Sequence, residues 1–202
     1  MKVRANRAYG DFRRRLAAGP EIFRRWAGTA YRVTTLDYPS PAAILSGQGS
    51  FLHGGRWNAP GSFRAVYGST TDVIAVQESG ATASYAGIPL PFKTPRLLVA
   101  IELSLQRVLD LSDADALGRL ELTVDELRVE DWRKVQAEGF ESFTQALGRA
   151  AFETGASGLL VPSARVPSGV NVVYFPENRT TAEEAKVCEP EKLDRIRGFD
   201  EC

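Results

Sequence analysis

The residues with the clearest potential for chemistry are a glycine-rich run over positions 46–61 and the only histidine of the chain, His53, which lies inside it. The run lacks the G-K-[ST] ending of a Walker loop, and after Gly47 and Gly49 a leucine stands where a Rossmann fingerprint needs glycine. One histidine cannot supply the usual zinc ligands, and no G-x-S-x-G elbow presents a serine to it. An enzyme built on this chain must therefore work with Arg, Glu, Tyr, Ser and Asn, and no metal is expected.

Short apolar segments predict the strands that position these groups. They lie at residues 30–34, 64–68, 96–103, 108–111, 159–162 and 171–175. The segment 96–103 is a near-continuous apolar run, which is typical of a central strand, and 108–111 is expected to pair with it.

Helical patterns alternate irregularly with these strands. They occur over residues 1–28 with a second start at Pro20, over 70–84 with Thr70 or Thr71 as cap, in short pieces over 113–134, and over 143–151 before Gly155. No regular strand–helix–strand rhythm is present, so the pattern indicates an α+β fold rather than a doubly wound one.

Length and composition indicate one ordinary globular domain, either alone or with a small appendage. The chain has 202 residues with 25 basic and 25 acidic side chains, so the net charge gives no indication of a nucleic-acid or membrane partner. No secretory signal or membrane-length apolar run is visible, and Cys188 and Cys202 form no disulfide framework. A cytoplasmic location is the expectation.

The two ends differ from the middle in composition. Residues 1–28 form a basic helical arm, which is either a solvated or docked face or a binding surface for an acidic partner. Residues 29–176 form the expected catalytic domain, and 177–202 form a charged tail that packs on the domain or extends it.

Four segments together carry a family resemblance. They are Tyr31-Arg32, GGRWN over residues 54–58, VYGS…QES over 66–79, and VPSAR…NVVYF over 161–175. Their order resembles the RES-domain family, the toxins of bacterial RES–Xre toxin–antitoxin systems, over residues 31–176. The resemblance implies an ADP-ribosyltransferase-like mixed β core with surrounding helices, and an activity that consumes NAD.

The resemblance also implies which residues act. The family's arginine, glutamate and serine match Arg32, Glu78 and Ser163, which become the expected catalytic residues. The expected substrate-binding residues are Tyr31, Arg56, Tyr67 and Asn171.

Elementary chemistry supports these roles but does not require them. Arginine forks suit the pyrophosphate of NAD, although Arg32 could instead pair with a core carboxylate and Arg56 could be an exposed turn residue. Cleavage of the glycosidic bond develops positive charge on the ribose, which the Glu78 carboxylate would stabilise if it is not simply a solvated helix residue.

The other side chains have similar alternatives. Tyr67 could stack on the nicotinamide ring or pack in the core. Ser163 could bond the ribose or the nicotinamide amide, or serve only a turn. Asn171 would orient the Ser163 loop, and Tyr31 would shape the pocket.

Three functions remain open from the residues. The first is cleavage of NAD with water or phosphate as acceptor, by a toxin held by a protein antitoxin. The second transfers ADP-ribose to a protein. The third is a non-catalytic module that binds nucleic acid or a partner. The oligomeric state is undecided, with a homodimer left open.

Overall fold

The computed structural model describes residues 3–37, 39–85 and 95–193. Its centre is a six-stranded sheet in the order β1-β2-β5-β4-β3-β6, in which β1 also pairs with β3. The strands are β1 (Phe23–Thr34), β2 (Val66–Ser69), β3 (Leu97–Asp110), β4 (Gly158–Pro162), β5 (Val170–Tyr174) and β6 (Glu184–Val187). Because β1 pairs with both β2 and β3, five strands close on themselves, while β6 lies outside this ring against residues 101–104 of β3.

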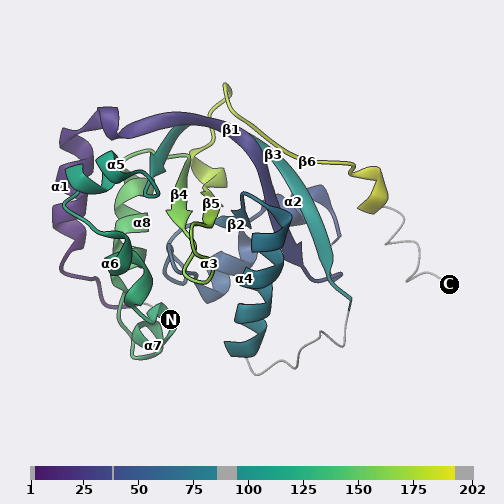
Figure 1. Cartoon of the computed structure of the whole chain (residues 1–202), viewed down its shortest axis with the longest axis horizontal. Coiled ribbons are helices and arrows are strands. Elements are labelled where there is room, and N and C mark those ends of the chain that lie inside the picture. Colours follow the sequence, from purple (N-terminus) through teal and green to yellow (C-terminus); the bar gives the residue numbers. More distant parts are fainter. Residues whose placement is uncertain (1–2, 38, 86–94, 194–202) are drawn as a thin grey trace.

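Helices surround this core. They are α1 (Tyr9–Ala18), α2 (Pro41–Leu45), α3 (Gln48–His53), α4 (Asp72–Tyr85), α5 (Ala114–Arg119), α6 (Val124–Val129), α7 (Trp132–Ala137) and α8 (Phe143–Glu153), with 3-10 turns at Pro20–Ile22 and Pro176–Asn178. Figure 1 shows α1, α5, α6, α7 and α8 gathered at one end of the sheet and α2 and α4 toward the other. The predicted α+β fold, a mixed β core with surrounding helices, is confirmed.

Two hydrophobic clusters cover the two faces of the strands. Successive side chains of a strand point to opposite faces, so Leu109 belongs to one cluster and Val108 to the other. Val173 and Val172 on β5 divide in the same way. The first cluster includes Trp57 and the buried face of α8, and it therefore fixes the glycine-rich segment against that helix.

Several predicted elements are confirmed. Thr71 caps α4 by accepting a hydrogen bond from the Ile74 amide at 3.3 Å. Gly155 adopts a φ of 85° just after α8, as expected of a helix stop. The region 113–134 holds the short helices α5, α6 and α7.

Other predictions were wrong. Residues 23–28 are strand rather than helix, because β1 starts at Phe23 and pairs with β3 along almost its whole length. Pro20 begins only a three-residue 3-10 turn. Residues 108–110 are not a separate strand but the end of the 14-residue β3, and the glycine-rich run contains the helix α3.

Four of the seven described arginines in the first 28 residues form ion pairs with carboxylates. Arg13 pairs with Glu153, Arg15 with Asp11 and Glu121, and Arg24 with Asp110. These pairs hold α1 and the start of β1 on the body of the protein. The division at residues 28 and 176 stays a prediction, although β1 crosses the first boundary and β6 lies beyond the second.

Two further observations concern the cysteines and the lengths of the helices. Cys188 is a free, partly buried thiol, and Cys202 lies outside the described residues. Within residues 3–37, 39–85 and 95–193, no helix combines the length and the apolar character needed to cross a membrane.

Candidate active site

A cleft of about 970 Å³ opens between β1, β2 and β5 on one side and α4 and α7 on the other. Six of the seven residues predicted from the sequence line it, namely Tyr31, Arg32, Arg56, Tyr67, Glu78 and Asn171. The seventh, Ser163, lies directly behind Glu78 and is almost completely buried. The structure therefore brings together residues that are up to 140 positions apart in the chain.

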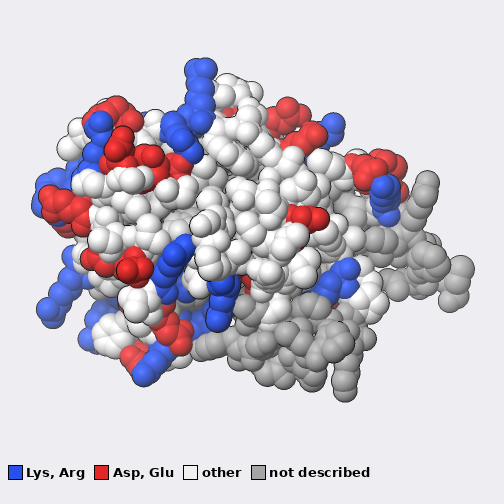
Figure 2. Space-filling view, viewed as in Figure 1, with Lys and Arg blue, Asp and Glu red and all other residues white. Residues whose placement is uncertain are grey.

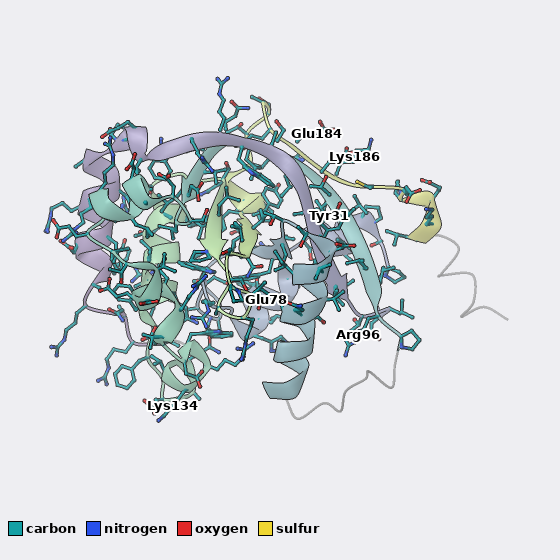
Figure 3. All side chains as sticks on the ribbon, in the orientation of Figure 1. Tyr31, Glu78, Arg96, Lys134, Glu184 and Lys186 are labelled. Carbon is teal, nitrogen blue, oxygen red and sulfur yellow. The ribbon has the colours of Figure 1, made fainter. Side chains whose placement is uncertain are left out.

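Glu78 is held rigidly by two donors. Its Oε1 accepts a hydrogen bond from Ser163 Oγ at 2.6 Å and another from Asn171 Nδ2 at 2.8 Å. Ser69 Oγ in turn donates to Asn171 Oδ1 at 2.7 Å, which fixes the amide orientation. Glu78 Oε2 accepts no hydrogen bond from the described residues, so one carboxylate oxygen is fixed and the other is free to meet a ligand. Figure 3 shows Glu78 projecting from α4 toward the loop after β4.

The Ser163 hydroxyl donates its proton to the Glu78 carboxylate. Its Oγ accepts hydrogen bonds from the amides of Arg165 at 3.1 Å and Val166 at 2.9 Å while its own proton goes to Glu78. A hydroxyl with its lone pairs and proton engaged in this way is poorly suited to act as a nucleophile. The predicted contact of Ser163 with the substrate stays a prediction.

Arg32 is a half-buried cation that lines the cleft and has no carboxylate partner among the described residues. Its Nη1 donates to the carbonyl oxygen of Tyr67 at 2.8 Å, and its Nε is buried without a hydrogen-bond partner. Burial lowers the pKa of the Arg32 guanidinium below its ordinary value. A partly desolvated cation attracts an anion more strongly than an exposed one, because solvent screens the interaction less.

Arg56 connects the glycine-rich loop to the far wall of the cleft. Its Nη1 donates to the carbonyl oxygens of Leu127 at 3.1 Å and Glu130 at 3.3 Å, at the end of α6. Burial first and the nearby Arg133 second lower the pKa of Arg56, while the negative charge of Glu78 opposes the shift. Arg56 therefore lies in the field of both a second cation and the central carboxylate.

The hydroxyl of Tyr67 anchors the loop that carries Arg56. It donates to Asn58 Oδ1 at 2.7 Å and accepts from the Trp57 amide at 3.0 Å. Burial raises the pKa of Tyr67 well above its ordinary value, so the phenol keeps its proton. A Cβ at position 55 would lie 2.3 Å from this hydroxyl, which explains why glycine occupies that position.

Tyr67→Phe is expected to destabilise the protein by about 1–3 kcal/mol, because the Trp57 amide and the buried Asn58 carbonyl lose their partner. Urea unfolding measures the change. Tyr31→Phe is the matched control, since the Tyr31 hydroxyl has no hydrogen bond to the described residues. Equal stability of both variants and the wild type would contradict the anchoring role.

Several residues of the site were missed by the sequence reasoning. Ser69 and Asn58 act behind the predicted residues, and Asn58 could have been found because it belongs to GGRWN. Arg96 and Arg133 line the cleft but belong to no motif that the sequence reveals, whereas Arg165 could have been found because it ends VPSAR. In the view of Figure 2, basic side chains emerge between the positions that α7 and α4 occupy in Figure 1. Among the described residues, no group of three or more His, Cys, Asp or Glu could hold a metal ion.

Comparisons with known proteins show the family of the chain. The family model described as "RES domain" matches residues 29–195. The chain is 31% identical over 150 residues to the NAD(+) phosphorylase MbcT of Mycobacterium tuberculosis, covering 73% of this chain and 72% of the relative, and the same values hold for MbcT of Mycobacterium bovis. The crystal structure of the M. tuberculosis MbcT–MbcA toxin–antitoxin complex superposes with a TM-score of 0.65 and 26% identity, covering 93% of this chain and 97% of that chain.

Proposed function

Since the chain belongs to the RES-domain family, we propose that it is an NAD-degrading toxin that cleaves the bond between nicotinamide and ribose. The observation that carries the proposal is the Glu78 carboxylate, which is fixed through Oε1 and open at Oε2 in a cleft lined by arginines. NAD presents an anionic pyrophosphate and a ribose that becomes cationic as nicotinamide leaves, and this site offers a counter-charge to each.

Six of the seven predicted residues have a role in this proposal. The free oxygen of Glu78 stabilises the positive charge that develops at the ribose. Ser163 and Asn171 hold the carboxylate so that it does not reorganise during the reaction. Arg32 binds the pyrophosphate, and the rings of Tyr31 and Tyr67 form the walls beside the nicotinamide.

We propose phosphate as the acceptor, because the relatives in two Mycobacterium species are named NAD(+) phosphorylases. The decisive experiment incubates the purified protein with NAD, with and without phosphate, and identifies the products. ADP-ribose phosphate formed only with phosphate supports phosphorolysis, and free ADP-ribose in both samples indicates hydrolysis. Label fixed on protein would indicate ADP-ribosylation instead, and intact NAD in every sample would reject the enzyme.

The toxin acts in the cytoplasm, where NAD is abundant, and a protein antitoxin restrains it. The support for an antitoxin is the structural relative, which is a toxin–antitoxin complex. The binding-module alternative loses some support because four of the seven described arginines of the N-terminal arm are in ion pairs with this chain's own carboxylates.

Arg32→Lys is expected to weaken NAD binding by about tenfold or more, because lysine keeps the charge but loses the fork that grips the pyrophosphate. Calorimetry in a Glu78→Gln background measures the affinity without turnover. Arg119→Lys, in an exposed ion pair outside the cleft, is the control and should bind NAD like its parent. Unchanged affinity in the Arg32 variant would reject the pyrophosphate assignment.

A further inference from the structure

Arginine is the commonest charged residue in the lining of the cleft. Among the described residues, five arginines and one carboxylate line it. The charged lining residues are Arg32, Arg56, Arg96, Arg133, Arg165 and Glu78. The NAD pyrophosphate carries two negative charges and its nicotinamide ring one positive charge. One arginine, Arg32, is assigned above to the pyrophosphate, and guanidinium groups elsewhere in the lining have the chemistry to bind a second, separate anion.

Arg56 and Arg133 are the two arginines best placed to hold that anion. They reach the cleft from different elements, Arg56 from the loop after α3 and Arg133 from α7. They are close enough that the charge of Arg133 lowers the pKa of Arg56, although Glu78 and Glu130 act on it in the opposite direction. Two neighbouring guanidinium groups with this mutual repulsion gain stability when an anion lies between them.

Both arginines are held in position by their surroundings. Arg56 uses only Nη1 for its bonds to Leu127 and Glu130, so Nε and Nη2 make no hydrogen bond to the described residues. Arg133 stacks on the Trp132 ring with its guanidinium carbon 4.4 Å from the ring centre. Gln136 Nε2 donates to the carbonyl oxygen of His53 at 3.0 Å, which ties α7 to the loop that carries Arg56. The pair is thus preorganised rather than free to separate.

We propose that Arg56 and Arg133 form the subsite for the acceptor phosphate, and that Arg133 determines whether phosphate or water takes the ribose. This inference rests on the proposed function. Glu78 lines the same cleft as the pair and its charge acts on Arg56, so we place the phosphate on the side of the cleft where Glu78 faces the ribose. The C1′–N bond breaks with its electron pair going to the pyridinium nitrogen, and a phosphate oxygen forms the new C1′–O bond. The products are nicotinamide and ADP-ribose 1″-phosphate.

The test measures how Arg133→Gln changes the use of phosphate relative to NAD. We expect the KM for phosphate to rise about tenfold, the KM for NAD to stay near the wild-type value, and the share of free ADP-ribose among the products to increase. Arg133→Lys should recover part of the phosphate affinity, because it restores the charge but not the fork. Lys134→Gln is the matched control, because Lys134 lies on the same helix, is exposed and does not line the cleft (Figure 3).

The possible outcomes separate this inference from the proposed function. A wild-type protein that cleaves NAD at the same rate with and without phosphate would overturn the acceptor subsite and leave NAD cleavage intact. An Arg133→Gln variant with a higher KM for NAD and an unchanged KM for phosphate would assign Arg133 to the dinucleotide instead. Wild-type kinetics in Arg133→Gln would also overturn the inference. A wild-type protein that leaves NAD intact would reject the proposed function itself.

Discussion

Glu78→Gln is expected to lower NAD turnover by about 10²–10³-fold, because it removes the negative charge that faces the developing ribose cation. The amide oxygen of glutamine can still accept the hydrogen bonds that Ser163 and Asn171 give to Oε1. The change therefore replaces only the free oxygen Oε2 with a neutral amino group. The initial rate of nicotinamide release at saturating NAD measures the effect.

Asp72→Asn is the matched control for this substitution. Asp72 lies on the same helix, α4, and the change also removes one carboxylate charge, but Asp72 is exposed and does not line the cleft. We expect Asp72→Asn to keep wild-type turnover. If the thermal unfolding midpoint of Glu78→Gln is close to that of the wild type, the loss of turnover comes from the missing carboxylate charge and not from misfolding. Wild-type turnover in Glu78→Gln would show that Glu78 is not catalytic.

The same pair of variants tests the toxin in cells. Expression of the wild-type chain without an antitoxin should arrest growth and lower cellular NAD, whereas Glu78→Gln should be tolerated. Toxicity caused by misfolding or by the basic N-terminal arm would persist in Glu78→Gln, because the substitution changes neither. Equal toxicity of both forms with steady NAD would support the binding-module alternative, and NAD loss without growth arrest would indicate a housekeeping enzyme.

The strand β4 and the helix α8 could be predicted from the sequence, because the apolar patterns that specify them lie within each segment. The predicted strand 159–162 falls on β4, whose residues are all buried, and the helix at 143–151 follows from its apolar spacing and its glycine stop. The first half of β1 could not be predicted in this way. Arg24 and Arg25 read as a polar helical surface, and only the pairing with β3, more than 70 residues later, makes the segment a strand.

The site was predictable as a set of residues but not as an arrangement. Glu78 and Ser163 stood out through the family resemblance, yet the 2.6 Å contact between them depends on how β4, β5 and α4 meet. Arg133 has no motif and lies in a charged region that resembles an ordinary solvated surface. Its place in the cleft depends on tertiary contacts, such as the hydrogen bond from Gln136 of α7 to the carbonyl oxygen of His53, which no local pattern in the sequence predicts.

The loop that carries Arg56 also packs closely against α8, at Gly148. A substitution at Gly148 is therefore expected to have the second large effect, on the stability of the protein. A Cβ at Gly148 would lie 1.9 Å from the carbonyl oxygen of Trp57, so the helix passes directly against the GGRWN backbone. Gln145 on the same helix donates to the carbonyl oxygen of Gly55 at 3.0 Å. Gly148→Ala must therefore push the loop from the helix and weaken this bond.

Gly148→Ala is expected to lower the free energy of unfolding by about 3 kcal/mol, at the upper end of what overpacking a core costs, because backbone rather than a flexible side chain must move. Urea unfolding measures the change. Ordinarily Gly→Ala inside a helix stabilises a protein by about 0.5–1 kcal/mol, and Gly118→Ala in α5, where no atom lies within 4 Å of the new Cβ, should do so. The two substitutions change helix propensity in the same way. Stability changes of opposite sign would therefore show the effect of the contact between position 148 and Trp57. If Gly148→Ala instead stabilised the protein as Gly118→Ala does, α8 would not support the loop that carries Arg56, and the rigid cleft inferred from it would have no basis.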